Sequence, residues 1–171
     1  MGVIAVFGEH RGGALRKAVL SAVTAGKNLA EKTGKELVGV VCGSGVKGVA
    51  EDMASYGLKK VYYIDHPVLK DYTAEAYTEA ISQLAKSVQL DAFLATATTT
   101  GKDLAPRLAI KLDAGMASDI CEVISGDTFK RYLYAGSIIS AVKVNTPRIV
   151  LTVRGTAFPK AEKSGGGEVE E

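Results

Sequence analysis

The sequence predicts an α/β domain in which helices cover both faces of a mostly parallel sheet, with antiparallel strands added towards the C-terminus. Three observations support this prediction. Short, continuous apolar runs alternate with amphipathic helical patterns as far as Leu112. The connections between them are short and contain Gly, Asp and Pro residues, which end helices and strands. After Met116 strand-like runs follow one another directly, separated by turn residues.

The first strand is predicted at residues 3–7, where Val-Ile-Ala-Val-Phe is apolar throughout. An uninterrupted apolar run is typical of a strand buried on both faces. A turn follows at residues 9–13. From Leu15 to Ala30 apolar and small residues recur every three or four positions, which predicts a long helix with one buried face. Gly34 is a helix-terminating residue at its end.

The same alternation continues along the next part of the chain. Apolar runs predict three more buried strands, and the segments between and after them have helical patterns. Strands joined by helices lie parallel and are connected by right-handed crossovers, which places helices on both faces of the sheet. The predicted strands span residues 37–42, 61–64 and 92–95, and the predicted helices span residues 46–56, 73–88 and 102–112.

Four strand-like runs occupy the last third of the sequence, at residues 120–124, 129–135, 138–144 and 149–153. Because turn residues and no helical patterns separate them, we expect them to form an antiparallel meander added to the parallel sheet. The final residues, 160–171, are polar and rich in glycine. Such a segment buries too little apolar surface to order itself, so it is predicted to be a flexible tail or linker.

The composition excludes several classes of protein. With 171 residues the chain suits one domain, and its 21 basic and 19 acidic residues nearly balance, which gives no electrostatic footprint for nucleic acid. Aromatic residues make up 6% and Trp is absent, so base-stacking platforms are not expected. No apolar run has the roughly 20 residues of a membrane span, and no targeting segment is evident, so we expect a cytoplasmic protein without membrane insertion.

The thiols and imidazoles do not form a recognisable site. Cys42 and Cys121 lie in apolar runs without a CxxC partner, so both are predicted to be buried free thiols. His10 and His66 follow predicted strands and cannot hold zinc without further ligands, so no metal site is expected. No set of nucleophile and base is visible, and we predict no stand-alone enzyme.

The segment from Ala97 to Arg107 is the strongest candidate for a binding site, since it follows a buried strand and opens a helix. Threonine hydroxyls and free amides at a helix start can hold an anion, and the carboxyl end of a strand is where ligands bind in open α/β sheets. Lysine would add a charge, and arginine a bidentate contact with carboxylate or phosphate. The candidate residues are Thr98, Thr99, Thr100, Gly101, Lys102 and Arg107.

A purely structural role explains the same segment. A threonine before a helix is a normal N-cap, and Asp103 in the first turn favours the helix dipole. The spacing is not that of a P-loop. Both interpretations remain open at this point, and anion binding would make the chain a free-standing adenine-nucleotide-binding module. A small hydrolase or ligase is a third hypothesis, for which no residue set is evident.

Several motifs, in the same order along the chain, resemble those of electron-transfer flavoprotein alpha subunits. The resemblance extends from about Val3 to Phe158. Tyr132, Ser137 and Gly155 depart from it, where the family has Pro, Asn and Pro, and we expect only local changes of geometry there. The matching motifs are ATTTGKDLAPR at 97–107, ASDI at 117–120, TFKRYLYAGS at 128–137 and LTVRGTAF at 151–158.

The resemblance implies a Rossmann-like, three-layer fold similar to that of the adenine-nucleotide hydrolases. Residues 1–158 would be the N-terminal α/β domain, residues 159–171 a flexible tail or the start of an interdomain linker, and the FAD domain would be absent from this chain. FAD would then be bound in the full-length complex and not by this chain alone. The implied role is a scaffold and assembly domain of an electron carrier, paired with a beta subunit and serving dehydrogenases and a quinone oxidoreductase or similar acceptor.

Overall fold

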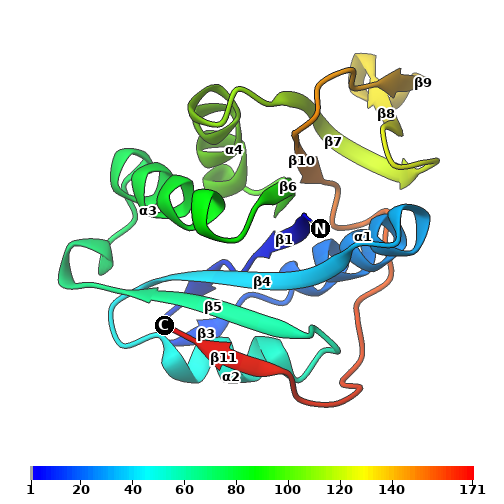
Figure 1. Cartoon of the computed structure of the whole chain (residues 1–171). Coiled ribbons are helices and arrows are strands. Elements are labelled where there is room, and N and C mark those ends of the chain that lie inside the picture. Colours follow the sequence, from blue (N-terminus) through cyan, green and yellow to red (C-terminus); the bar gives the residue numbers. More distant parts are fainter. Residues whose placement is uncertain (1) are drawn as a thin grey trace.

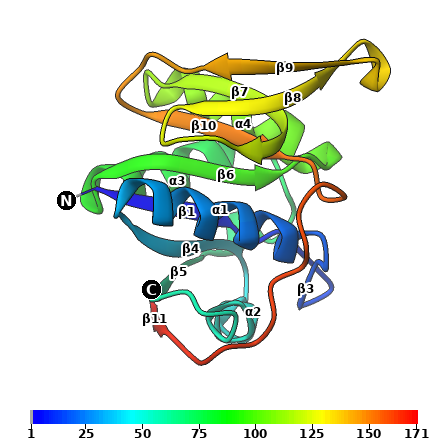
Figure 2. The same ribbon diagram turned by 90° about the vertical axis from the view of Figure 1, so that its right-hand side faces the viewer.

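The computed structural model describes residues 2–171, in which a nine-stranded sheet has two helices on each face (Figures 1 and 2). The predicted α/β architecture is therefore confirmed. The strands of the large sheet, in spatial order, are β11 (Glu168–Glu170), β5 (Lys60–Asp65), β4 (Glu36–Gly43), β1 (Val3–Phe7), β6 (Leu90–Thr96), β10 (Ile149–Val153), β7 (Gly115–Val123), β8 (Thr128–Leu133) and β9 (Ile138–Lys143).

The helices form two layers around this sheet. The helices on one face are α1 (Val19–Thr33) and α2 (Lys47–Ala54), and those on the other are α3 (Ala74–Ser87) and α4 (Thr99–Lys111). Each helix is amphipathic and buries its apolar side against the strands, which stabilises the fold through the hydrophobic effect. Short 3-10 turns lie at Pro67–Leu69 and Tyr134–Gly136.

The start of the first helix differs from the prediction. The apolar pattern predicts a helix from Leu15, but α1 begins at Val19, and Leu15 lies in a small hairpin made of β2 (His10–Arg11) and β3 (Ala14–Leu15). The hairpin turn consists of Gly12 and Gly13, both at positive φ (58° and 76°), a conformation that glycine adopts without steric cost. Apolar spacing at Leu15 matched a helix because its half-buried side chain packs against the same core.

The predicted meander of four antiparallel strands is wrong for its last member. β7, β8 and β9 are antiparallel neighbours, whereas β10 lies between β6 and β7 and is parallel to both. All five residues of β10 are buried, as expected for an interior strand covered on both faces. β9 ends beside the start of β7, where the Thr146 hydroxyl of the following loop accepts from the amide of Gly115 at 2.7 Å, so β10 starts at the same end of the sheet as β7 and runs parallel to it.

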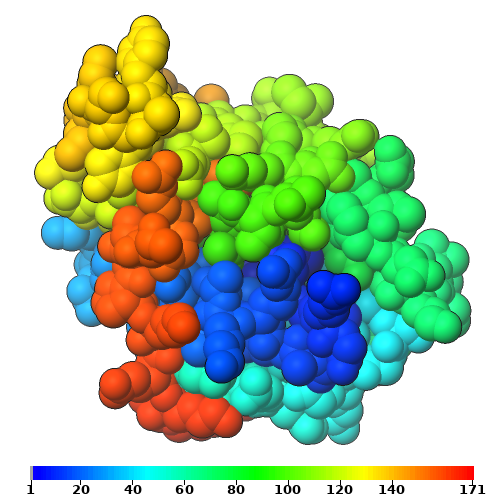
Figure 3. Space-filling view, turned by 180° about the vertical axis from the view of Figure 1, so that it is seen from behind, coloured from blue at the N-terminus to red at the C-terminus, as the bar shows by residue number. Residues whose placement is uncertain are grey.

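The C-terminal segment follows the surface of the molecule (orange to red in Figure 3) and ends beside β5. Residues 168–170 form β11, parallel to β5, where the sequence predicted no stable structure. The reason is that a short strand can order itself by completing the ladder of an existing sheet edge, even with little apolar surface. The assignment of residues 159–171 to an interdomain linker stays a prediction.

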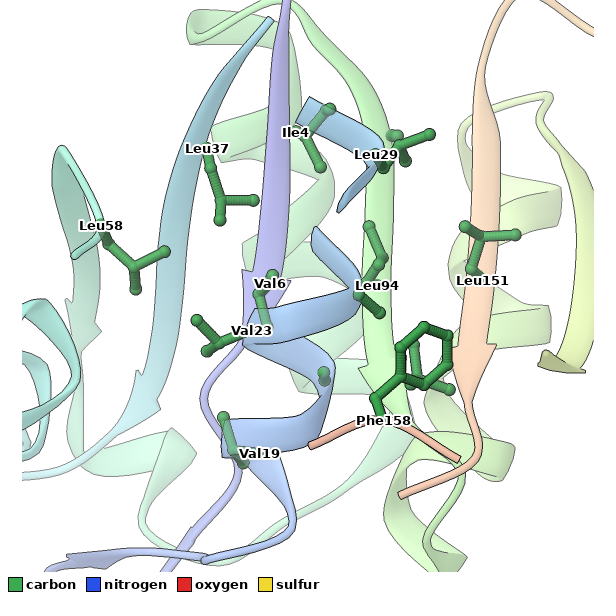
Figure 4. Close-up of a cluster of buried hydrophobic side chains, with 14 of the residues drawn as sticks. Ile4, Val6, Val19, Val23, Leu29, Leu37, Leu58, Leu94, Leu151 and Phe158 are labelled. Carbon is green, nitrogen blue, oxygen red and sulfur yellow. The ribbon is translucent and has the colours of Figure 1, made fainter. Parts of the chain in front are cut away.

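Side chains from distant segments meet in the core on the α1 face, as Figure 4 shows. Val19, Val23 and Leu29 of α1 pack against strand residues such as Leu94, and Phe158 closes the cluster beyond β10. The core thus joins the last motif of the sequence to its first helix. Both cysteines are free, as predicted, but only Cys42 is buried, whereas Cys121 is half-buried.

Candidate functional site

The order of the parallel strands reverses between β1 and β6. From β1 the chain proceeds to β4 and β5 on one side and later to β6 on the other side. In open α/β sheets, ligands bind at the carboxyl ends of the strands at such a point. The first polar side chains beyond these two strands are Glu9, after β1, and Thr98, after β6.

Glu9 and Thr98 contact each other directly across this crevice. The Thr98 hydroxyl Oγ1 donates to Glu9 Oε2 over 2.6 Å. The other carboxylate oxygen, Oε1, accepts from Nη1 of Arg16 at 2.6 Å. Although Glu9 is only 7% exposed, its charge is paired and hydrogen-bonded, which is the condition for burying a carboxylate at acceptable cost. The chain's own carboxylate therefore lies between the β1 loop and the start of α4.

Thr98 is also the N-cap of α4. Its Oγ1 accepts a hydrogen bond from the amide of Gly101 at 3.1 Å, and its backbone is extended, as an N-cap requires. A Cβ on Gly101 would stand 1.9 Å from the carbonyl oxygen of Thr96, so only glycine fits at that position. The structural role that the sequence suggested for this segment is thus present in the fold. Its anion-binding role stays a prediction.

The remaining candidate residues separate into two groups. Thr99, Thr100 and Lys102 lie in the first turn of α4 with Thr98 and Gly101, and Lys102 is exposed. Arg107 does not join them, because it lies two turns further along α4. Its guanidinium pairs with Glu75 of α3, at 3.3 Å, and with Asp103, at 3.5 Å. The structure therefore brings five of the six predicted residues together.

Asp119 and Arg154 are neighbours of this loop that the residue patterns did not connect. The carboxylate of Asp119 accepts from Nη2 of Arg154 at 2.6 Å and from its Nε at 3.2 Å. The guanidinium of Arg154 stacks 4.6 Å from the ring centre of Tyr132. Hydrogen bonds from Arg154 hold the pKa of Asp119 below its ordinary value; burial opposes this shift, and the charges of Arg154 and Lys102 add to it.

These residues line a cavity of about 430 Å³ at the carboxyl ends of β6 and β10. Both side chains come from motifs that support the family resemblance, ASDI and LTVRGTAF, so their membership of a common site had a sequence signal. No pattern in the sequence indicated that Asp119 and Arg154 pair with each other. The cavity is bounded by Ala18, Ser21, Thr96, Ala97, Thr98, Asp119, Arg154, Gly155, Thr156 and Lys160.

In residues 2–171 no group of three or more His, Cys, Asp or Glu side chains is arranged to hold a metal ion. None of the helices in this part of the chain combines the length and the apolar character needed to cross a membrane.

The comparison with protein families decides the membership of the chain. The electron transfer flavoprotein domain matches residues 4–171. The chain belongs to the electron transfer flavoprotein family. Membership confirms the resemblance found in the sequence motifs, and the Rossmann-like α/β fold agrees with it.

Individual members of the family are similar over nearly the whole chain. The electron transfer flavoprotein subunit alpha of Bacillus subtilis is 33% identical over 172 residues, which cover 98% of this chain and 52% of the relative. A probable mitochondrial alpha subunit of Caenorhabditis elegans is 37% identical, over 96% of this chain and 49% of the relative. The Pseudomonas aeruginosa alpha subunit is also 37% identical, over 98% and 53%. The chain spans about half the length of the curated relatives it matches.

Proposed function

We propose that this chain is the N-terminal scaffold and assembly domain of an electron transfer flavoprotein alpha subunit. With a beta subunit and FAD, that protein carries electrons from dehydrogenases to a quinone oxidoreductase or a similar acceptor. The matches to alpha subunits over nearly all of this chain support the proposal. Under this proposal, the domain is a component of an electron carrier and performs no catalytic step of its own.

The position of Glu9 supports a scaffold role for this domain and not a nucleotide-binding one. A dinucleotide or adenine nucleotide at the switch point would place its phosphates at the start of α4. There the Thr98 hydroxyl already binds the Glu9 carboxylate at 2.6 Å. Like charges this close repel each other, and displacing Glu9 would leave Arg16 without its partner. The residues present at this crevice therefore fit a phosphate group poorly, and we expect the FAD of the complex to be held elsewhere.

The purified chain provides the first test. We expect it to be colourless, to show no flavin absorbance after incubation with FAD, and to co-purify with the beta subunit from the same organism when the two are co-expressed. A yellow preparation, with flavin bound to this chain alone, would contradict the scaffold role.

Calorimetry with ATP and AMP tests the nucleotide-binding alternative. We expect no heat of binding at millimolar nucleotide, because Glu9 occupies the start of α4. Measurable affinity that is weakened by Lys102→Ala would instead support a nucleotide-binding module at the Thr98–Lys102 loop. Lys17→Ala is a control for loss of one positive charge outside α4.

A further inference from the structure

The cavity of about 430 Å³ at the carboxyl ends of β6 and β10 is separate from the crevice that Glu9 occupies. Glu9 does not line this cavity, and its carboxylate is already paired with Arg16. Ala18 and Ala97 give the wall an apolar part. Small-molecule sites in proteins measure roughly 300–1,000 Å³ and combine apolar walls with a few polar groups. This β6–β10 cavity therefore has room for an organic molecule.

Positive charge around the β6–β10 cavity is not fully paired. Lys160 lines the cavity, Lys102 lies in the first turn of α4, and both side chains are exposed. Neither lysine forms an ion pair with any residue in the range 2–171. The carboxylate in the wall, that of Asp119, is already paired with Arg154 at 2.6 Å. The local charge therefore favours a negatively charged ligand.

The start of α1 adds to this positive potential. Ala18, in the cavity wall, is the N-cap of α1 and has no side chain to cap the helix, and the first turn contains no acidic residue. The positive end of the helix dipole is thus left without a negative partner. The segment after β10 passes this helix start, as Figure 2 shows, and the amide of Ala161 donates to the carbonyl of Leu20 at 3.0 Å. This contact holds Lys160 beside the start of α1.

Ser21, in the first turn of α1, contributes a buried hydroxyl to the same wall. The residue is 1% exposed and lines the cavity. Its Oγ makes no hydrogen bond within the part of the chain that the structure describes, and it is not among the fully enclosed polar atoms there, so it faces the cavity. A buried hydroxyl without a partner costs free energy. An oxygen atom of a bound molecule would supply the missing partner.

The guanidinium of Arg154 is held in place and retains a free donor. Its Nε and Nη2 atoms bind the carboxylate of Asp119, and its plane lies 4.6 Å from the ring centre of Tyr132. Its Nη1 atom has no hydrogen-bond partner among residues 2–171. A group that is already ordered loses little conformational entropy when it binds a ligand. Arg154 is thus prepared to donate to an oxyanion in the cavity.

We propose that the β6–β10 cavity binds a small organic acid. Its carboxylate accepts from Nη1 of Arg154 and from the ammonium group of Lys160, and its apolar part lies against Ala18 and Ala97. A carboxylate suits this wall better than a phosphate, because it brings one negative charge, and not two, close to Asp119. The inference goes beyond the scaffold role and does not depend on it.

An NMR titration of the purified chain tests the proposal. The probes are sodium butyrate, inorganic phosphate and butylammonium chloride, each added at constant ionic strength and pH 7. We expect butyrate to shift the backbone amide signals of Ser21 and Gly155 with saturation at millimolar concentration. Phosphate should bind more weakly, and butylammonium, which has the same apolar body and the opposite charge, should shift neither signal.

Two variants change the charge and the space of the cavity separately. Lys160→Gln removes an exposed charge without a partner and should raise the dissociation constant for butyrate about fivefold. Gly155→Leu should abolish binding, because a Cβ at this position stands 3.7 Å from Cγ2 of Thr96 without a clash and the rest of the side chain fills the cavity. Lys47→Gln and Gly48→Leu, at exposed positions of α2, are the matched controls and should bind butyrate normally.

The remaining outcomes would overturn the proposal. If butyrate shifts neither amide signal, the cavity binds no small organic acid. The same conclusion follows if Lys160→Gln and Gly155→Leu, shown by circular dichroism to be folded, both bind butyrate as tightly as the wild-type chain does. Tighter binding of phosphate than of butyrate would contradict the assignment of a carboxylate. Co-purification with the beta subunit tests the scaffold role independently of each of these results.

Discussion

Asp119 combines a carboxylate that binds Arg154 with a left-handed backbone conformation, at φ 55°. Among non-glycine residues, Asp and Asn tolerate this region best, because their short polar side chains can bond locally. The residue lies where the pairing of β7 with β10 shifts register, and its amide donates to the hydroxyl of Thr152 at 2.7 Å. The conformation directs the carboxylate to the Arg154 side of the site.

We predict that Asp119→Asn and Asp119→Ala lower the free energy of unfolding by different amounts. Asparagine tolerates the backbone but loses the charge pair, so the free energy of unfolding at pH 7 should fall by about 1 kcal/mol. Alanine should lose about 1 kcal/mol more, since it disfavours the left-handed region. Urea denaturation measures both values. Equal stability of the two variants would show that the backbone at this position is not strained for alanine.

The pairing of Asp119 with Arg154 makes the stability of the fold depend on pH, with a loss of stability in acid. Arg154 lowers the pKa of Asp119 in the folded chain, so the stabilisation is present above the ordinary aspartate value of 3.8 and is lost as pH falls through the lowered folded pKa. The difference between the wild-type chain and Asp119→Asn should therefore shrink in acid. A difference that grows towards low pH would contradict this assignment.

Single residues were predictable from the sequence only where the signal is local. The capping role of Thr98 follows from a threonine between a strand and a helix, and the structure has it. The partners of Asp119 are 33 and 35 positions away, in β10 and just after it, and no periodicity encodes such a pair. The same reason applies to Arg107: its ion pair with Glu75 depends on how α3 packs beside α4, which no local pattern in the sequence indicates.

At the scale of the secondary-structure elements, the stability of α4 depends on its N-cap residue, Thr98. Thr98→Ala removes the cap of Gly101 and a hydrogen bond to the buried Glu9 carboxylate. We expect the free energy of unfolding to fall by about 2 kcal/mol, from the cap and from the weakened pairing of Glu9. Thr99→Ala, one residue further, changes an exposed side chain and should lie within about 0.5 kcal/mol of wild type in the same urea titration. Similar losses for both variants would argue against a specific cap.

The apolar runs of the sequence predicted the interior strands of the sheet, but not the position of β10 or the presence of β11. Runs that are apolar throughout predicted β1, β4 and β6 correctly, because strands buried on both faces have no polar positions. The Ile149–Val153 run has nearly the same character, yet it was grouped with its antiparallel predecessors because turn residues precede it. All five residues of β10 are buried, so the apolar composition of this run indicated an interior strand more reliably than the turn residues before it indicated an antiparallel one. β11 has no such signal, since its order depends on the edge of β5.

At the scale of the whole molecule, the layer between the sheet and α3 contains two groups that are kept neutral by burial. Desolvation raises the pKa of Cys42, in β4, to about 12. Desolvation is also the main cause that raises the pKa of Tyr77, in α3, to about 12. Its hydroxyl lies 3.1 Å from the carbonyl oxygens of both Cys42 and Leu69, which share its single proton. Ionising either group would require charge in this apolar layer, which joins the strands to one of the helix pairs.

This layer should make the fold sensitive to alkali. Because both pKa values are raised in the folded chain, the folded state retains protons that the unfolded state releases above the ordinary values of 9.0 and 10.0. Stability is thus fully present below these values and is lost as pH rises towards about 12. The urea midpoint should fall over this window. Tyr77→Phe combined with Cys42→Ala lowers stability at neutral pH but should flatten the decline, since neither replacement titrates. An equally steep decline in the double variant would place the alkali-sensitive groups elsewhere in the protein.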